Sequence, residues 1–140
     1  MRLDRTGNRT LREDLTEFLQ AMPHTVVLTM PTALNRGLIG KDLSGYLVEG
    51  GGESGFTFLG YIPYQIDGQR QGFEHIVERN AITREVCAAL GVRLIDLYAA
   101  FDTAGSADFR EHFYDVLHLR PRSYPLMAQI VYDGIEDLLR

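Results

Sequence analysis

The sequence predicts an α/β fold, in which parallel strands are flanked by helices. Two observations support this class: helical and strand-like segments alternate along the chain, and the two clearest strands are apolar without a polar alternation. Near-continuous apolar strands are typical of parallel sheets that are covered on both faces. An alternating order of helices and strands favours right-handed crossover connections. We expect the 140 residues to form a single domain.

The first predicted helix covers residues 10–22. Thr10 and Glu13 form the T-x-x-E pattern of a capping box, in which each side chain bonds to a free backbone N–H of the first turn. Apolar residues then recur at helical spacing, and Pro23 ends the run. Residues 25–30 follow as the first predicted strand, because they are rich in β-branched and apolar side chains.

A long segment without a persistent period follows this strand. Residues 31–72 contain the run Gly50-Gly51-Gly52 and are predicted to be an insertion loop near the rim of a functional site. The next helix is expected over residues 73–90, with Gly91 as the residue that follows its last turn.

The last third of the chain contributes one more strand and one more helix. Residues 92–97 are the second predicted strand, and residues 101–119 are predicted to be loop-like. The final helix is expected to begin at about Pro121 or Ser123 and to reach Leu139. Two clear strands are fewer than the roughly four to six of a typical sheet, so we expect the fold to be incomplete.

Composition and charge exclude several classes of partner. The net charge is −5 and basic residues do not cluster, so nucleic acid is not an expected partner. No stretch approaches the roughly 18 apolar residues of a membrane span, and Met1–Arg5 is not followed by the apolar segment of a signal peptide. A cytoplasmic location is expected only if the chain is complete. Cys87 is the only cysteine, which excludes an internal disulfide and favours a buried core position.

The strongest chemical motif is Asp115-Val116-Leu117-His118, just before the final helix. An acid three residues before a histidine can accept a hydrogen bond from the ring Nδ1, which leaves Nε2 to take a proton from a nucleophile. In open α/β sheets, catalytic groups gather on loops beyond the carboxyl ends of the strands. Because the loop after residues 92–97 leaves such an end, His118 and Asp115 are the candidate catalytic residues.

Three stretches of the chain resemble the SGNH hydrolases, also called GDSL esterases and lipases. The segment Phe113-Tyr114-Asp115-Val116-Leu117-His118-Leu119, with the helix after it, is similar to the last block of that family. Residues 80–97 resemble the family's penultimate helix and strand, and residues 14–31 resemble the helix and strand after its third block. Only the D-x-x-H block is catalytic in the family, and the other two stretches are scaffold.

The resemblance implies a flavodoxin-like sheet and hydrolysis of O-acyl esters, such as acetylated sugars or lipid-like esters, without a metal or another cofactor. By position, His118 is the general base and then the general acid, and Asp115 orients it. The family's G-D-S and G-x-N-D blocks are absent, so no nucleophile is identified and the chain is expected to begin downstream of them. Ser54, in Gly52-Glu53-Ser54-Gly55, lacks the pattern and the setting of a nucleophile elbow. We therefore expect the isolated chain to be inactive or weakly active.

Other interpretations of the same residues remain open. The chain fits a non-catalytic α/β binding module that retains a hydrolase-like C-terminus and self-associates through an exposed sheet edge. A weaker alternative is a metal site built from Asp108, His112, Asp115 and His118, whose spacing matches no known geometry. Asn80 stands on an apolar helix face, where a buried amide needs hydrogen-bond partners. Bracing of the catalytic loop is the functional hypothesis for this residue.

Overall fold

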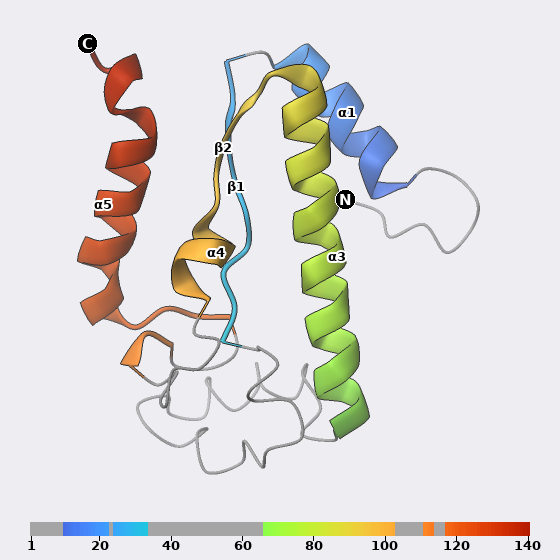
Figure 1. The fold of residues 1–140 in the computed structure, drawn as a ribbon, viewed down its shortest axis with the longest axis vertical. Coiled ribbons are helices and arrows are strands. Elements are labelled where there is room, and N and C mark those ends of the chain that lie inside the picture. The colour runs from blue at the N-terminus through green and yellow to red at the C-terminus, as the bar shows by residue number, and fades with distance from the viewer. Residues whose placement is uncertain (1–9, 23, 34–65, 103–110, 114–116) are drawn as a thin grey trace.

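The computed structural model describes residues 10–22, 24–33, 66–102, 111–113 and 117–140, and only the backbone of residues 66–72 (Figure 1). The two strands are β1 (Val26–Leu28) and β2 (Arg93–Ile95). The helices are α1 (Leu11–Ala21), α3 (Ile66–Leu90), α4 (Leu97–Phe101) and α5 (Tyr124–Ile135), with short 3-10 turns at Pro121–Ser123 and Glu136–Leu138.

In the described residues, a two-stranded parallel sheet has helices on both of its faces. β1 pairs with β2 in parallel, with Val27 opposite Leu94. Helices α1 and α3 lie on one side of the strands and α5 lies on the other (Figure 1). Both strands run toward the end of the molecule where α4 and the segment around residue 118 lie (Figure 1). The α/β class and the parallel pairing are therefore confirmed.

Helix α1 begins as its sequence predicts. The Thr10 N–H donates to Glu13 Oε2 at 2.7 Å, and the Glu13 N–H donates to Thr10 Oγ1 at 3.3 Å. These two bonds complete the capping box and satisfy backbone donors that the helix itself leaves unpaired. The predicted stop at Pro23 lies outside the described residues.

Helix α3 is longer than the sequence pattern predicts. It begins at Ile66 rather than at residue 73, so the predicted insertion loop over residues 31–72 is wrong in its last part. Gly68 and Gly72 lower the helix propensity of this first part, which explains why the pattern there favoured a loop. Residues 34–65 of that predicted loop lie outside the described residues.

The end of α3 confirms the role predicted for Gly91. Its φ of 67° lies in the left-handed region, where a side chain would be strained. The Val92 N–H donates to the Cys87 carbonyl at 2.9 Å, and the Gly91 N–H donates to the Ala88 carbonyl at 3.4 Å. This pair of bonds is a Schellman motif, which turns the chain directly from α3 into β2.

The predicted strand over residues 92–97 is too long at its carboxyl end. β2 stops at Ile95, and Asp96 caps the short helix α4 by accepting a hydrogen bond from the Ala99 N–H at 3.1 Å. Asp96 therefore bonds to the backbone of the turn that follows β2, and that turn is a helix that the apolar pattern did not reveal. The sequence Leu97–Phe101 is equally compatible with a strand.

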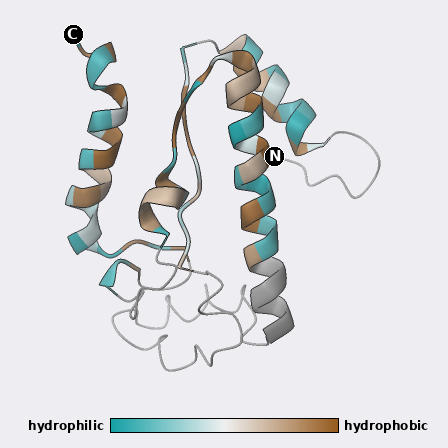
Figure 2. Cartoon of the chain, viewed as in Figure 1, coloured by the Kyte–Doolittle hydropathy of each residue, from teal (hydrophilic) through white to brown (hydrophobic). Residues whose placement is uncertain are grey.

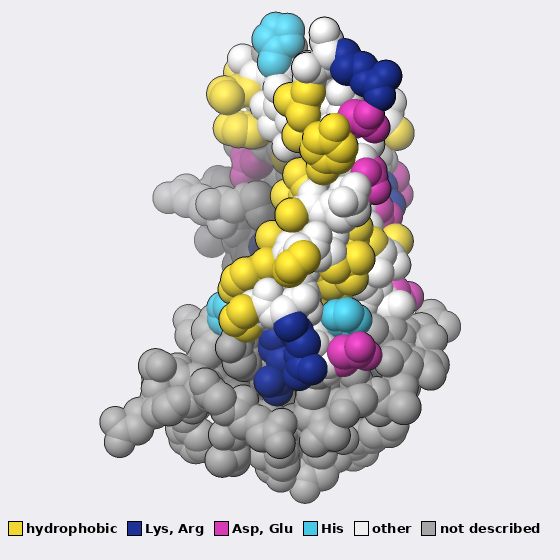
Figure 3. All heavy atoms as spheres, turned by 90° about the vertical axis from the view of Figure 1, so that its left-hand side faces the viewer, with side chains coloured by type: hydrophobic (Ala, Val, Ile, Leu, Met, Phe, Trp, Pro, Cys, Tyr) yellow, Lys and Arg dark blue, Asp and Glu magenta, His cyan; other side chains and the backbone are white. Residues whose placement is uncertain are grey.

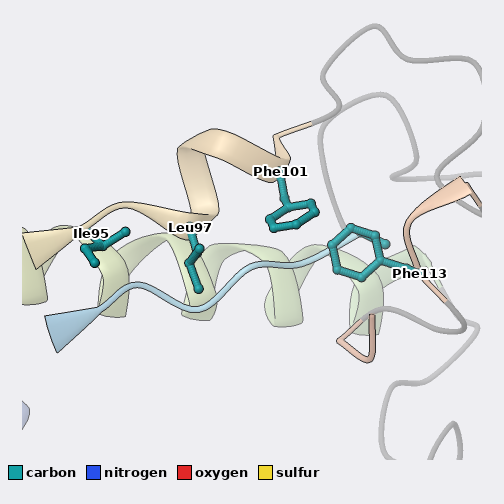
Figure 4. Close-up of a cluster of buried hydrophobic side chains, with 5 residues drawn as sticks. Ile95, Leu97, Phe101 and Phe113 are labelled. Carbon is teal, nitrogen blue, oxygen red and sulfur yellow. The ribbon is translucent and has the colours of Figure 1, made fainter. Parts of the chain in front are cut away.

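The core has one apolar cluster on each side of the sheet. On the α5 side, Ile95, Leu97, Phe101 and Phe113 are buried, and the Phe101 and Phe113 rings meet edge to face at 6.0 Å between centroids (Figure 4). On the α1 and α3 side, the fully buried Cys87 packs with the other members of the second cluster, Leu19 and Val86. The prediction that Cys87 is a core residue is confirmed.

The helices carry both polar and apolar side chains on their surfaces, and the face with α5 has several exposed apolar side chains. Hydrophilic and hydrophobic residues both occur along α1, α3 and α5 (Figure 2). Hydrophobic side chains form a band along the face that carries α5 (Figure 3), where Tyr124, Leu126 and Tyr132 are between 43 and 51% exposed. Among the described residues, no helix has the length and apolar character needed to cross a membrane.

Candidate active site

The carboxyl ends of the two strands are joined by a side-chain network around Asp96. Thr29 Oγ1 donates to Asp96 Oδ1 at 2.7 Å and itself accepts from the Tyr98 N–H at 2.9 Å. Arg84, on α3, donates from Nε to Asp96 Oδ2 at 2.7 Å and from its terminal nitrogen to Oδ1 at 2.9 Å. This fork of bonds is the strong form of a carboxylate–guanidinium pair, and it fixes α3 against the ends of β1 and β2.

The same network sets the charge of Asp96. Burial alone would raise the pKa of Asp96, but the hydrogen bonds from Arg84, from Thr29 and from the Ala99 N–H outweigh it, so the pKa is lowered. Because its oxygens already accept bonds from these groups, Asp96 is an ionised structural anchor and not a proton acceptor for catalysis. Arg84 also lies over the Tyr98 ring, with its guanidinium carbon 5.5 Å from the ring centroid.

The segment that carries His118 is held at both ends. Phe113 and Leu119 form an isolated antiparallel bridge. The Arg120 N–H donates to the His112 carbonyl at 2.7 Å, and Arg120 Nε donates to the Phe113 carbonyl at 3.0 Å. Since Phe113 is completely buried in the core, the bridge ties the two ends of this loop to the packed part of the fold.

His118 itself is exposed, and it directly precedes Leu119, one of the two residues of the bridge. The neighbouring Leu117 and Leu119 are partly buried and pack against the core cluster on the α5 side. The predicted partner, Asp115, lies outside the described residues.

His112 and Ser123 form a second polar pair that the sequence did not indicate. His112 Nδ1 lies 3.0 Å from Ser123 Oγ, and Ser123 Oγ also donates to the His112 carbonyl at 3.3 Å. These contacts fit an Nδ1–H that donates to the hydroxyl oxygen. Serine often caps helices, but the Ser123 side chain makes no capping bond and is only 1% exposed. Its burial also excludes it as an accessible nucleophile.

Asn80 is buried and bonds to the backbone at the end of β1. Its Oδ1 accepts from the Met30 N–H at 2.9 Å, and its Nδ2 donates to the Met30 carbonyl at 3.0 Å. Only 3% of Asn80 is exposed, so the expected need of a buried amide for partners is met. The segment that Asn80 holds is the end of β1.

A groove of about 600 Å³ runs beside β1 and reaches the segment before His118. Apolar side chains from α1, β1 and α3 form most of its wall, and Leu117 contributes to it as the residue next to His118. The described residues that line it are Leu11, Leu15, Val27, Leu28, Met30, His75, Ile76, Arg79, Asn80, Thr83 and Leu117. The groove thus connects the open side of β1 with the loop that carries the candidate base.

Among the described residues, the candidate base His118 has no accessible serine that could act as its nucleophile. Ser44, Ser54 and Ser106 lie outside the described residues, and Ser123 is buried. In the part of the chain that the structure describes, no group of three metal-ligating side chains comes together. Two members of the alternative metal set, Asp108 and Asp115, lie outside that part.

Comparison of the chain with protein-family models, with curated proteins and with solved structures found no match.

Proposed function

We propose that the chain is part of an ester hydrolase of the SGNH type. In this proposal His118 takes the proton of a serine and returns it to the leaving alcohol, and Asp115 accepts the Nδ1 hydrogen bond of His118. The substrate class is an O-acyl ester. The serine comes from a polypeptide segment that is not among these 140 residues, because the sequence contains no G-D-S block.

The exposure of His118 is the observation that carries the proposal. The residue lies on a tethered loop at the carboxyl ends of parallel strands, where open α/β sheets bind their ligands. A general base must reach a substrate, and a side chain buried behind α5 would not. The bridge to the buried Phe113 holds Leu119, the residue after His118, against the core, which favours a defined orientation of the histidine.

The order of the elements supports the flavodoxin-like part of the proposal. A helix precedes β1, a second helix connects β1 to the parallel β2, and a last helix follows β2. The first two helices contact each other on one side of the sheet, and α5 lies on the other (Figure 1). A flavodoxin-like sheet has parallel strands with helices on both of its faces, and the described elements agree with that arrangement.

The experiment that tests this proposal begins with the coding DNA upstream of Met1. We expect an in-frame extension that encodes a G-D-S block and then a G-x-N-D block. The longer protein should hydrolyse p-nitrophenyl acetate, and His118→Ala should lower kcat by about 10⁴-fold or more, as loss of a triad base does. His24→Ala is the matched control, since His24 is an exposed histidine before β1, and this variant should keep full activity.

Two results would contradict the proposal. The first is an in-frame stop codon directly before Met1. The second is a longer protein whose esterase activity survives His118→Ala. A different outcome, strong turnover by the 140-residue chain that depends on His118, would show that the nucleophile lies within this chain.

The second candidate function is that of a non-catalytic binding module. The groove beside β1 favours it, because this groove adjoins a strand edge and is lined mainly by apolar side chains. An accessible strand edge is a common docking site for another polypeptide.

A further inference from the structure

One edge of β1 carries backbone groups without partners among the described residues. The Thr29 N–H donates to the Ile95 carbonyl at 3.2 Å, so Thr29 faces β2. Backbone groups of successive residues in a parallel strand point to opposite edges, and those of Leu28 and Met30 therefore point away from β2. Asn80 bonds to both groups of Met30. In the described part of the chain, the N–H and the carbonyl of Leu28 have no such partner.

The groove lies along this same edge. Val27, Leu28 and Met30 line it from the strand, and α1 and α3 form its other walls. Leu28 and Met30 are each 46% exposed. A bound molecule would therefore meet unpaired backbone groups and apolar side chains at the same time.

The charge of the groove indicates one further property of its ligand. Among the described residues, its lining contains Arg79 and His75 but no acidic side chain. Arg79 Nε is buried and has no hydrogen-bond partner, and the guanidinium is in none of the ion pairs among the described residues. A buried donor without a partner is costly, and a carboxylate is the group that matches a guanidinium best.

We propose that the groove binds an extended peptide segment, which adds to the open edge of β1 as a further strand and places a carboxylate on Arg79. A fatty acyl chain with a carboxylate would also fit the apolar walls and the charge. It would, however, shield the Leu28 N–H and carbonyl from water without replacing their hydrogen bonds, and that desolvation opposes binding. A peptide strand supplies both bonds, as strand addition does at other sheet edges.

The side-chain amide of Asn80 limits where this strand ends. Asn80 already makes the pair of bonds to Met30 that a neighbouring strand would make. The available edge is therefore centred on Leu28, and a short segment is long enough to cover it. Arg79 precedes Asn80 on α3, so the carboxylate belongs near the end of the segment that lies closest to Met30.

The test uses the 140-residue chain with ¹⁵N label and a panel of capped hexapeptides of alternating Val and Thr. Each peptide carries one Glu, moved through all positions, and its matched control carries Gln. At least one Glu peptide should shift the Leu28 amide resonance, slow its hydrogen exchange, and bind about tenfold more tightly than its Gln control. Arg79→Gln should remove this preference for Glu, whereas Arg122→Gln, at an exposed site that does not line the groove, should keep it.

Three results would overturn the proposal. The first is that no peptide in the panel shifts the Leu28 resonance. The second is that Glu and Gln peptides bind equally well to the unsubstituted chain. The third is that sodium dodecanoate binds in the groove, that Arg79→Gln weakens this binding, and that the peptides do not bind. This result would identify an amphiphilic anion as the ligand.

Discussion

Asn80 and Met30 are joined by two hydrogen bonds, in which one side-chain amide takes both backbone groups of one residue. A strand next to β1 would make the same kind of contact, so the amide closes the strand edge at this point. The pair also links the middle of α3 to the end of β1, because Asn80 is buried at the interface between them.

The first prediction concerns this amide. Asn80→Leu removes both bonds and leaves the Met30 groups beside an apolar side chain, so we expect the free energy of unfolding to fall by about 1–3 kcal/mol. Urea denaturation followed by circular dichroism measures it. Gln20→Ala, at an exposed position of α1, is the control and should change the free energy by less than about 0.5 kcal/mol. Equal values for the two variants would show that the Asn80 bonds contribute nothing.

The second prediction concerns pH and Asp96. The pKa of Asp96 is lowered in the folded chain, while an unfolded Asp titrates near about 3.9. Between the two values the unfolded state binds more protons, so stability falls as the pH drops through this window. Above the unfolded pKa the full contribution is present, and below the folded pKa it is lost.

Urea midpoints between pH 2 and pH 6 test this dependence. Asp96→Asn should flatten the loss of stability below about pH 4, because the variant has no carboxylate to protonate there. Asp137→Asn is the control: Asp137 pairs with Arg93, and this hydrogen bond lowers its pKa, but its side chain is 63% exposed. Since exposed ion pairs contribute little, a control curve as flat as that of Asp96→Asn would refute the assignment.

The third prediction concerns the close approach of α5 to β2. A Cβ added at Gly134 would lie 2.6 Å from Ile95 Cδ1, and Ile95 is only 4% exposed. Alanine favours a helix by about 1 kcal/mol over glycine, but overpacking a core costs about 1–3 kcal/mol. We therefore expect Gly134→Ala to destabilise the fold.

A double-mutant cycle measures the cause of this effect. Ile95→Ala removes both Cδ1 and Cγ1, the two atoms that the new Cβ would meet at 2.6 and 2.7 Å, so Gly134→Ala should be less destabilising in that background than in the original chain. If urea denaturation shows that the two substitutions have additive effects, contact with the Ile95 side chain is not the reason why alanine destabilises position 134.

Much of the scaffold follows from local patterns in the sequence. The capping box at Thr10, the stop at Gly91 and the burial of Cys87 are each determined by short-range chemistry, and each is observed. Helix α4 and the first part of α3 are different. The apolar run Leu97–Phe101 suits either type of element, and Gly68 and Gly72 weaken the helical signal of their segment.

The contacts of the candidate site cannot be predicted from local sequence patterns in the same way. His118 directly precedes Leu119, which forms a bridge with Phe113, a residue six positions earlier in the chain. The pairing of His112 with Ser123, and of Arg84 with Asp96, depends on how separate elements pack. Single residues and their spacing carry no signal for these contacts, so the sequence could supply the candidate base but not its surroundings.

The orientation of His118 by Asp115 is the central claim, and the tautomer of the His118 ring tests it most directly. Long-range ¹H–¹⁵N spectra of the 140-residue chain, recorded where the ring is neutral, should show the hydrogen on Nδ1. Asp115→Asn should abolish this preference, and Asp133→Asn, a carboxylate on α5 that accepts a hydrogen bond from Gln129 at 2.6 Å, should preserve it. A ring that carries its hydrogen on Nε2, with no response to Asp115→Asn, would contradict the account.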